Sequence, residues 1–129
     1  MINIKKIHHI AIITSDYNSS KLFYSEILGF KILKETYRSE RKSYKLDLEI
    51  NGEYQIELFS FPNPPERTTS PEARGLRHLA FEVDSIEDSV KYLNKNNIAT
   101  EPIKIDEITN KKYTFFRDPD NLPLEICEK

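Results

Sequence analysis

The sequence predicts an α+β fold made of two tandem βαβββ modules, which form a cupped or barrel-like mixed sheet with the helices outside. Three observations predict it. The order strand, helix, strand, strand, strand can be traced twice along the chain. The segment HIAI at His9 returns as HLAF at His78, and IELF returns as LEIC. The chain advances 48 residues from His9 to Glu57 and 47 from His78 to Glu125.

The first module is expected over about residues 5–60. Residues 7–14 are apolar and β-branched, which is typical of a buried strand. Asp16 is a plausible N-cap, and apolar residues at three- and four-residue spacing predict a helix over 17–28 that Gly29 ends. Three strands should follow, the last two joined by the hairpin signal Asn51–Gly52: 30–37, 44–50 and 53–60.

The second module is expected over about residues 76–129, after a connector of about 61–75 that contains four prolines. Asp84 or Ser85 should cap its helix over 86–96. Its strands are expected at 77–83, 98–105, 112–117 and 122–127. Because 129 residues are too few for two ordinary domains, we expect one domain over 1–129.

Composition and charge exclude several classes of function. Hydrophobic residues make up 38% and charged residues 31%, which is neither a disordered nor a membrane composition. The net charge is −2 and the basic residues are scattered, so we expect no nucleic-acid partner. No apolar run approaches the roughly 20 residues of a spanning helix, so no membrane is expected. The single cysteine, Cys127, fits a reducing compartment, and we expect a cytoplasmic protein.

Four residues could form a metal site. Strand alternation places His9, Glu57, His78 and Glu125 each on the face of its strand that points away from the helix. A strand glutamate is usually solvated and a single strand histidine is usually structural, and we interpret His8 as structural. The repeated His–Glu pairing favours metal ligation instead. Two imidazoles and two carboxylates suit Zn, Ni, Co, Mn or Fe with one or two open positions.

The chain resembles the vicinal oxygen chelate superfamily, which includes glyoxalase I, bleomycin-resistance proteins and ring-cleaving dioxygenases. The resemblance covers nearly the whole chain and is strongest to small, single-domain lactoylglutathione lyase-like members. It rests on IHHIAIITSD, SSKLFYSEILGF, IELFSF, GLRHLAFEVD and FFRDPDNLPLEI. It implies that the divalent metal is held by His9, Glu57, His78 and Glu125, with no organic cofactor.

The same resemblance implies a metal-dependent lyase or isomerase of glyoxalase I type, which acts through an enediolate. The substrate would be a small oxygen-chelating molecule, such as a 2-oxoaldehyde–thiol adduct. Glu125 would be the catalytic base and Glu57 its counterpart. Ile13 stands where glyoxalase I has an arginine that helps to bind glutathione. The identity of the thiol in the substrate therefore stays open.

Other functions remain open at this stage. An Fe(II) ring-cleaving dioxygenase needs two histidines and one carboxylate, so the additional Glu57 argues against it. An acyl-CoA epimerase is chemically close, but the resembling enzyme has glutamine at the position of Glu57. A non-catalytic drug-binding module would usually lack the His/Glu set. The resemblance also implies a homodimer, in which the metal site lies within one chain or is shared between two.

Overall fold

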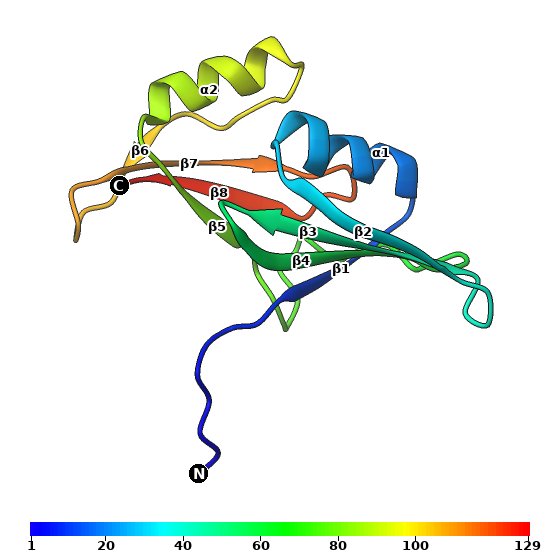
Figure 1. Ribbon diagram of the computed structural model, residues 1–129. Coiled ribbons are helices and arrows are strands. Elements are labelled where there is room, and N and C mark those ends of the chain that lie inside the picture. Colours follow the sequence, from blue (N-terminus) through cyan, green and yellow to red (C-terminus); the bar gives the residue numbers. More distant parts are fainter. The chain divides into compact units, whose positions relative to one another are not determined.

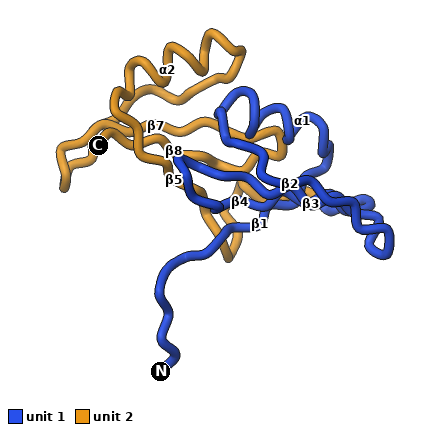
Figure 2. The backbone as a smooth tube through the Cα atoms, viewed as in Figure 1, with its two compact units in different colours: residues 1–65 blue, residues 66–129 orange.

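The computed structural model describes residues 1–129 and confirms the α+β fold of two βαβββ modules (Figure 1). The chain divides into two compact units, residues 1–65 and 66–129 (Figure 2). Each unit contains one four-stranded mixed sheet with the same strand pattern. None of the helices is long and apolar enough to cross a membrane.

The first unit forms a sheet in the order β1-β4-β3-β2. Strand β1 is parallel to β4, and the other neighbouring strands are antiparallel. A short α-helix follows β1 and runs directly into a π-helical turn, labelled η1. The elements are β1 (Ile10–Thr14), α1 (Tyr17–Leu22), η1 (Phe23–Ile27), β2 (Lys31–Arg38), β3 (Ser43–Ile50) and β4 (Glu53–Ser60).

Local chemistry explains where these elements begin and end. The Asp16 carboxylate accepts a hydrogen bond from the backbone N–H of Ser19 at 3.2 Å, so it caps α1 as predicted. The expected helix over 17–28 changes character at Phe23, whose carbonyl accepts from the N–H of Leu28 in a π-type bond of 2.9 Å. At the predicted hairpin, Asn51 and Gly52 have φ values of 49° and 89°.

The core of the first unit lies on the helix side of its sheet. Helix α1 contacts β4. Alternate residues of β3 and β4 meet in register, with Leu46 opposite Leu58 and Leu48 opposite Ile56. All four are buried, and so is Tyr24 of η1. The other face of the sheet is therefore left to the polar residues of the candidate site.

The second unit repeats this arrangement in the order β5-β8-β7-β6, again with one parallel pair, β5 and β8. The Ser85 hydroxyl accepts from the N–H of Asp88 at 3.2 Å and caps α2, which contacts β7 and β8. The elements are β5 (Leu79–Val83), α2 (Ile86–Lys95), β6 (Lys104–Ile105), β7 (Lys112–Arg117) and β8 (Pro123–Glu128). The core comprises Leu79, Ile86, Leu93, Phe116, Leu122, Leu124 and Ile126.

Three predicted strands are shorter than expected, and one of them, β5, begins at Leu79 rather than at residue 77. Strand β1 begins at Ile10 rather than at residue 7, because Ile10 is the first residue that pairs with β4. Ile7, which precedes it, is 78% exposed. The strand expected over 98–105 contains only β6, because residues before it make one backbone hydrogen bond to β7, from Glu101 N to Phe115 O. Apolar composition alone does not reveal whether a segment has a partner strand.

Candidate functional site

Both candidate histidines occupy the same position in their modules, one residue before the first strand. The parallel pairing then brings each one next to its glutamate. Ala11 lies opposite Glu57, and Ala80 lies opposite Glu125. Because alanine is small, it leaves room beside each carboxylate for the histidine ring. The structure thus brings together the predicted residues of each module.

In the first unit, His9 Nε2 lies 3.3 Å from Glu57 Oε2. The side chain of Glu57 is only 8% exposed, whereas that of His9 is 38% exposed. The Tyr54 hydroxyl donates a hydrogen bond to Glu57 and also lies 3.1 Å from Asp47 Oδ1. Lys45 Nζ is 3.8 Å from Glu57 Oε2. Glu57 is therefore held by several partners at once.

The phenol of Tyr54 is a permanent donor to this network. Burial raises its pKa above the usual value, and the hydrogen bond to Glu57 raises the pKa further. A neutral phenol keeps its proton at any physiological pH. Tyr54 thus fixes the orientation of the Glu57 carboxylate.

Sequence reasoning missed Tyr54 because it assumed an uninterrupted strand. Regular alternation puts Gln55 on the same face as Glu57 and places Tyr54 on the other. In the structure, Leu48 pairs with Ile56 but the next residue, Glu49, pairs with Tyr54, so β4 carries an extra residue at Gln55. This bulge turns Tyr54 onto the face of Glu57.

His8 is also part of the cluster. Its Nδ1 lies 2.8 Å from Nδ1 of His9, and the two rings meet edge to face with centroids 5.1 Å apart. One nitrogen must donate and the other accept. When His8 accepts, the proton of His9 sits on Nδ1 and leaves the Nε2 lone pair free on the Glu57 side. The interpretation of His8 as a structural residue did not anticipate this contact.

In the second unit, His78 Nε2 lies 3.0 Å from Glu125 Oε2, and the two side chains are 25% and 19% exposed. Arg77 Nη1 lies 3.2 Å from Nδ1 of His78. Since arginine can only donate, Nδ1 is the acceptor, and the proton of a neutral His78 is on Nε2, facing Glu125. The ring of Phe115 meets His78 edge to face at 5.1 Å.

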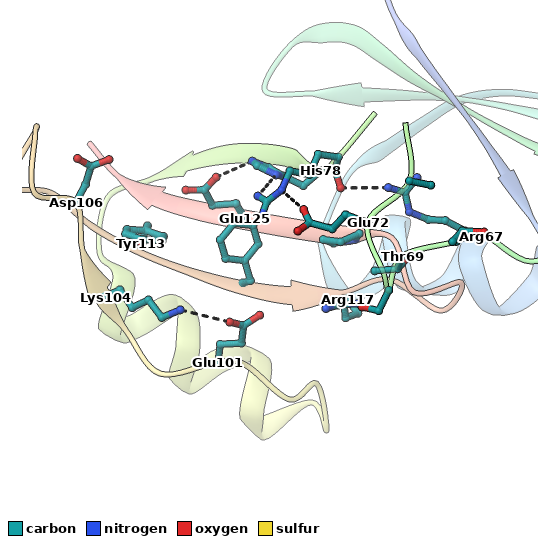
Figure 3. A pocket seen from close by; sticks show the side chains of 16 residues that line it. Arg67, Thr69, Glu72, His78, Glu101, Lys104, Asp106, Tyr113, Arg117 and Glu125 are labelled. Carbon is teal, nitrogen blue, oxygen red and sulfur yellow. Dashed lines mark hydrogen bonds and ion pairs between the residues drawn. The ribbon is translucent and has the colours of Figure 1, made fainter. Parts of the chain in front are cut away.

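A cavity of about 530 Å³ opens beside this second pair. Its walls come from β6, β7, β8, the connector and the residues just before β5, as Figure 3 shows. His78, Glu125 and Phe115 form part of the lining. Apart from Ala73, Pro123 and two aromatic side chains, the lining is polar or charged. Such a site suits a small polar ligand.

The donor atoms of each pair fit a divalent metal, although each unit supplies only two. An imidazole Nε2 and a carboxylate oxygen within 3.3 Å of each other can turn toward one cation, and both are ligands for Zn, Ni, Co, Mn and Fe. In neither unit do three or more His, Cys, Asp or Glu side chains gather into a metal-binding group. Each unit by itself therefore brings together two of the four predicted ligands.

The family model of the Glyoxalase/Bleomycin resistance protein/Dioxygenase superfamily matches residues 6–126. The chain belongs to this superfamily. It is 62% identical to the uncharacterized protein YwkD of Bacillus subtilis, over 98% of both chains. It also resembles the crystal structure of a glyoxalase family protein from Enterococcus faecalis, with 49% identity, coverage of 96% and 98%, and a TM-score of 0.89.

A more distant relative has a named activity. The chain is 25% identical to lactoylglutathione lyase of Schizosaccharomyces pombe, over 96% of this chain and 47% of that protein. Proteins of the superfamily generally use divalent metal ions, bind small molecules and often form dimers. The match of the family model confirms the expected family.

Proposed function

We propose that this protein is a metal-dependent lyase or isomerase of the glyoxalase I type that acts on a small oxygen-chelating substrate. The observation that carries the proposal is the pair of matching His–Glu contacts, at 3.3 Å in the first module and 3.0 Å in the second. A duplicated fold alone would not require the same two residue types, at the same position, in both modules.

In this proposal, His9, Glu57, His78 and Glu125 hold one divalent metal. The two pairs meet within one chain or across a homodimer of cytoplasmic protein. When bound, the metal supplies Lewis-acid stabilisation of negative charge on a substrate oxygen. The residues of the chain would orient the substrate, and a carboxylate would move a proton from the carbon next to the substrate carbonyl.

The surroundings of the two glutamates support Glu125 as the base and Glu57 as its counterpart. Glu57 is buried and receives the hydroxyl of Tyr54. Glu125 lines the cavity and has His78 as its only ion-pair partner. A base must move toward the substrate and return, which costs less for a carboxylate with one partner than for one with several.

A 2-oxoaldehyde–thiol adduct is the first substrate to test. The relationship to lactoylglutathione lyase supports it. Ile13, which stands in place of the glutathione-binding arginine, is 53% exposed and offers no charge to a peptide carboxylate. We therefore expect a smaller thiol than glutathione, or a different oxygen-chelating compound.

The test begins with the metal. Purified protein is stripped with a chelator, and binding of Zn, Ni, Co and Mn is measured by calorimetry. We expect one metal ion for each set of four ligands, His9, Glu57, His78 and Glu125. The double variant His9→Ala, His78→Ala should lose metal binding. No metal uptake by the wild-type protein would exclude the proposal and favour a binding module.

The reaction is then assayed with methylglyoxal plus a panel of thiols, and separately with catechols and Fe(II). Conversion of a hemithioacetal by the metal-loaded protein supports a lyase or isomerase. Oxygen consumption with a catechol, and no conversion of any hemithioacetal, would instead identify a ring-cleaving dioxygenase.

A further inference from the structure

The cavity of the second unit is lined by four side chains with permanent positive charge, two of which are neutralised by carboxylates. Arg77 Nε pairs with Glu72. Lys104 Nζ lies 3.8 Å from Glu101 Oε1. These two ion pairs leave Arg67 and Arg117 as the remaining cations of the lining.

Arg67 and Arg117 contact only uncharged acceptors. Arg67 Nη2 donates to the carbonyl oxygen of Leu76 at 2.6 Å and to that of Arg77 at 3.1 Å. Arg117 Nη1 donates to the side-chain oxygen of Asn121 at 2.8 Å. In addition, the Nε of Arg67 is buried and has no hydrogen-bond partner. An unpaired buried donor is costly, and no acceptor of the protein compensates the burial of this one.

The two arginines lie at the same end of the cavity. The Thr69 hydroxyl donates to the backbone oxygen of Asn121 at 2.8 Å, and the side chain of the same Asn121 accepts from Arg117 at the end of β7. Figure 3 shows Arg67, Thr69 and Arg117 at one end, with Lys104, Asp106 and Tyr113 at the other. The hydroxyl-bearing residues Thr68 and Ser70 also line the cavity beside Arg67.

We infer that this end of the cavity binds a terminal oxyanion of the substrate, a carboxylate or a phosphate, through Arg67, Arg117 and the connector hydroxyls. Guanidinium groups match the geometry of both anions with paired hydrogen bonds. His78 and Glu125 line the same cavity and would face the reacting end of the molecule. The assignment of that reacting end rests on the proposed function. The substrate class is then a small, anionic, oxygen-chelating compound.

Arg117 is the residue that tests the inference most cleanly. Arg67 also anchors the connector through Leu76 and Arg77, so its replacement could disturb the fold. Arg117 is exposed and its one side-chain hydrogen bond is to Asn121. Arg74 offers a matched control, because it is an exposed connector arginine outside the cavity lining.

The experiment is an NMR titration of metal-free, full-length protein at pH 8 with inorganic phosphate and, separately, with acetate. We expect at least one anion to shift the Arg117 and Arg67 side-chain signals. Its affinity should fall at least tenfold in Arg117→Gln and stay unchanged in Arg74→Gln, while the backbone spectrum shows that both variants are folded. Arg67→Lys should weaken binding as well. Failure of both anions to bind, or equal affinity in Arg117→Gln, would overturn the inference.

Metal titrations of the same variants separate this inference from the proposed function. Anion binding that depends on Arg117, in a protein that binds no metal, would retain the anion subsite and remove the proposed function. If the protein binds metal but its affinity for the anion does not depend on Arg117, the proposed function is retained and the anion subsite is removed. We expect wild type and Arg117→Gln to bind metal equally.

Discussion

The two modules place the same His–Glu pair in different surroundings. In the first, Glu57 is buried and contacts Tyr54, Lys45 and His9. In the second, Glu125 contacts His78 and lines an open cavity. The residue opposite each glutamate on the neighbouring antiparallel strand differs accordingly, Asp47 in the first module and Phe115 in the second. This difference supports the proposed division of tasks, in which Glu57 stays fixed and Glu125 is the base.

The sharpest way to break this comparison is to neutralise each glutamate. Glu125→Gln should lower turnover of an identified substrate by about 10²–10⁴-fold, the range typical of losing a general base, while the variant still binds metal. Glu57→Gln should instead weaken metal binding, because it removes the fixed carboxylate. Turnover and calorimetric metal affinity are measured on both variants. Wild-type turnover in metal-loaded Glu125→Gln would contradict the division of tasks.

Removal of the Tyr54 hydroxyl tests the surroundings of Glu57 in the first module alone. Tyr54→Phe leaves Glu57 and Asp47 without this donor, so we expect a loss of about 1–3 kcal/mol in the free energy of unfolding. Tyr113→Phe in the second unit is the control, since no hydrogen bond involves its hydroxyl, and should change stability by less than about 0.5 kcal/mol. Urea unfolding measures both. Equal effects would mean that Tyr54 does not hold Glu57.

The histidine neighbours differ between modules in a way that predicts opposite effects on metal affinity. His8 can accept a proton from His9 Nδ1 and so leave Nε2 free, whereas Arg77 can only donate to His78 Nδ1. His8→Ala should weaken metal binding by about tenfold, as loss of a partner behind a ligand usually does. Arg77→Gln should strengthen it several-fold. Calorimetry with Zn or Ni on both variants checks the signs.

Sequence alone predicted the fold and the His–Glu partnerships for an identifiable reason. Apolar periodicity, the caps at Asp16 and Ser85, and the Asn51–Gly52 turn are local signals, and all three appear in the structure. The pairing of His9 with Glu57 followed from the internal repeat. Tyr54 could not be found in this way. The bulge at Gln55 that turns Tyr54 toward Glu57 depends on how β4 pairs with β3, which local sequence signals do not reveal.

The cavity also lay beyond sequence reasoning. Arg67 lies in a proline-rich connector without periodicity, and its position at the cavity depends on hydrogen bonds to carbonyls nine and ten residues away. Arg117 is one of several scattered basic residues, and nothing in the sequence separates it from Arg74. Only the structure distinguishes the arginine that lines a cavity from the one that does not.

The smallest expected effect concerns charges outside both pairs. Hydrogen bonds from Lys21 and Tyr17 hold the pKa of Glu35 below its usual value. A lowered pKa stabilises the folded state above the unfolded pKa of about 4.5, and this contribution is lost as the pH falls through the folded value. Because the pair is about one-third exposed, Glu35→Gln should cost less than about 1 kcal/mol at pH 7.

The cost of Glu35→Gln should be smaller at pH 3 than at pH 7, because protonation of Glu35 as the pH falls removes the charge difference between wild type and variant. Urea unfolding at the two pH values measures it. Glu87→Gln in the second unit is the counterpart, because a hydrogen bond from Lys112 lowers the pKa of Glu87 in the same way at a more exposed place. Its effect should be smaller still, since water and salt screen the pair. A larger loss of stability for Glu87→Gln than for Glu35→Gln would contradict the expectation that the more exposed ion pair contributes less.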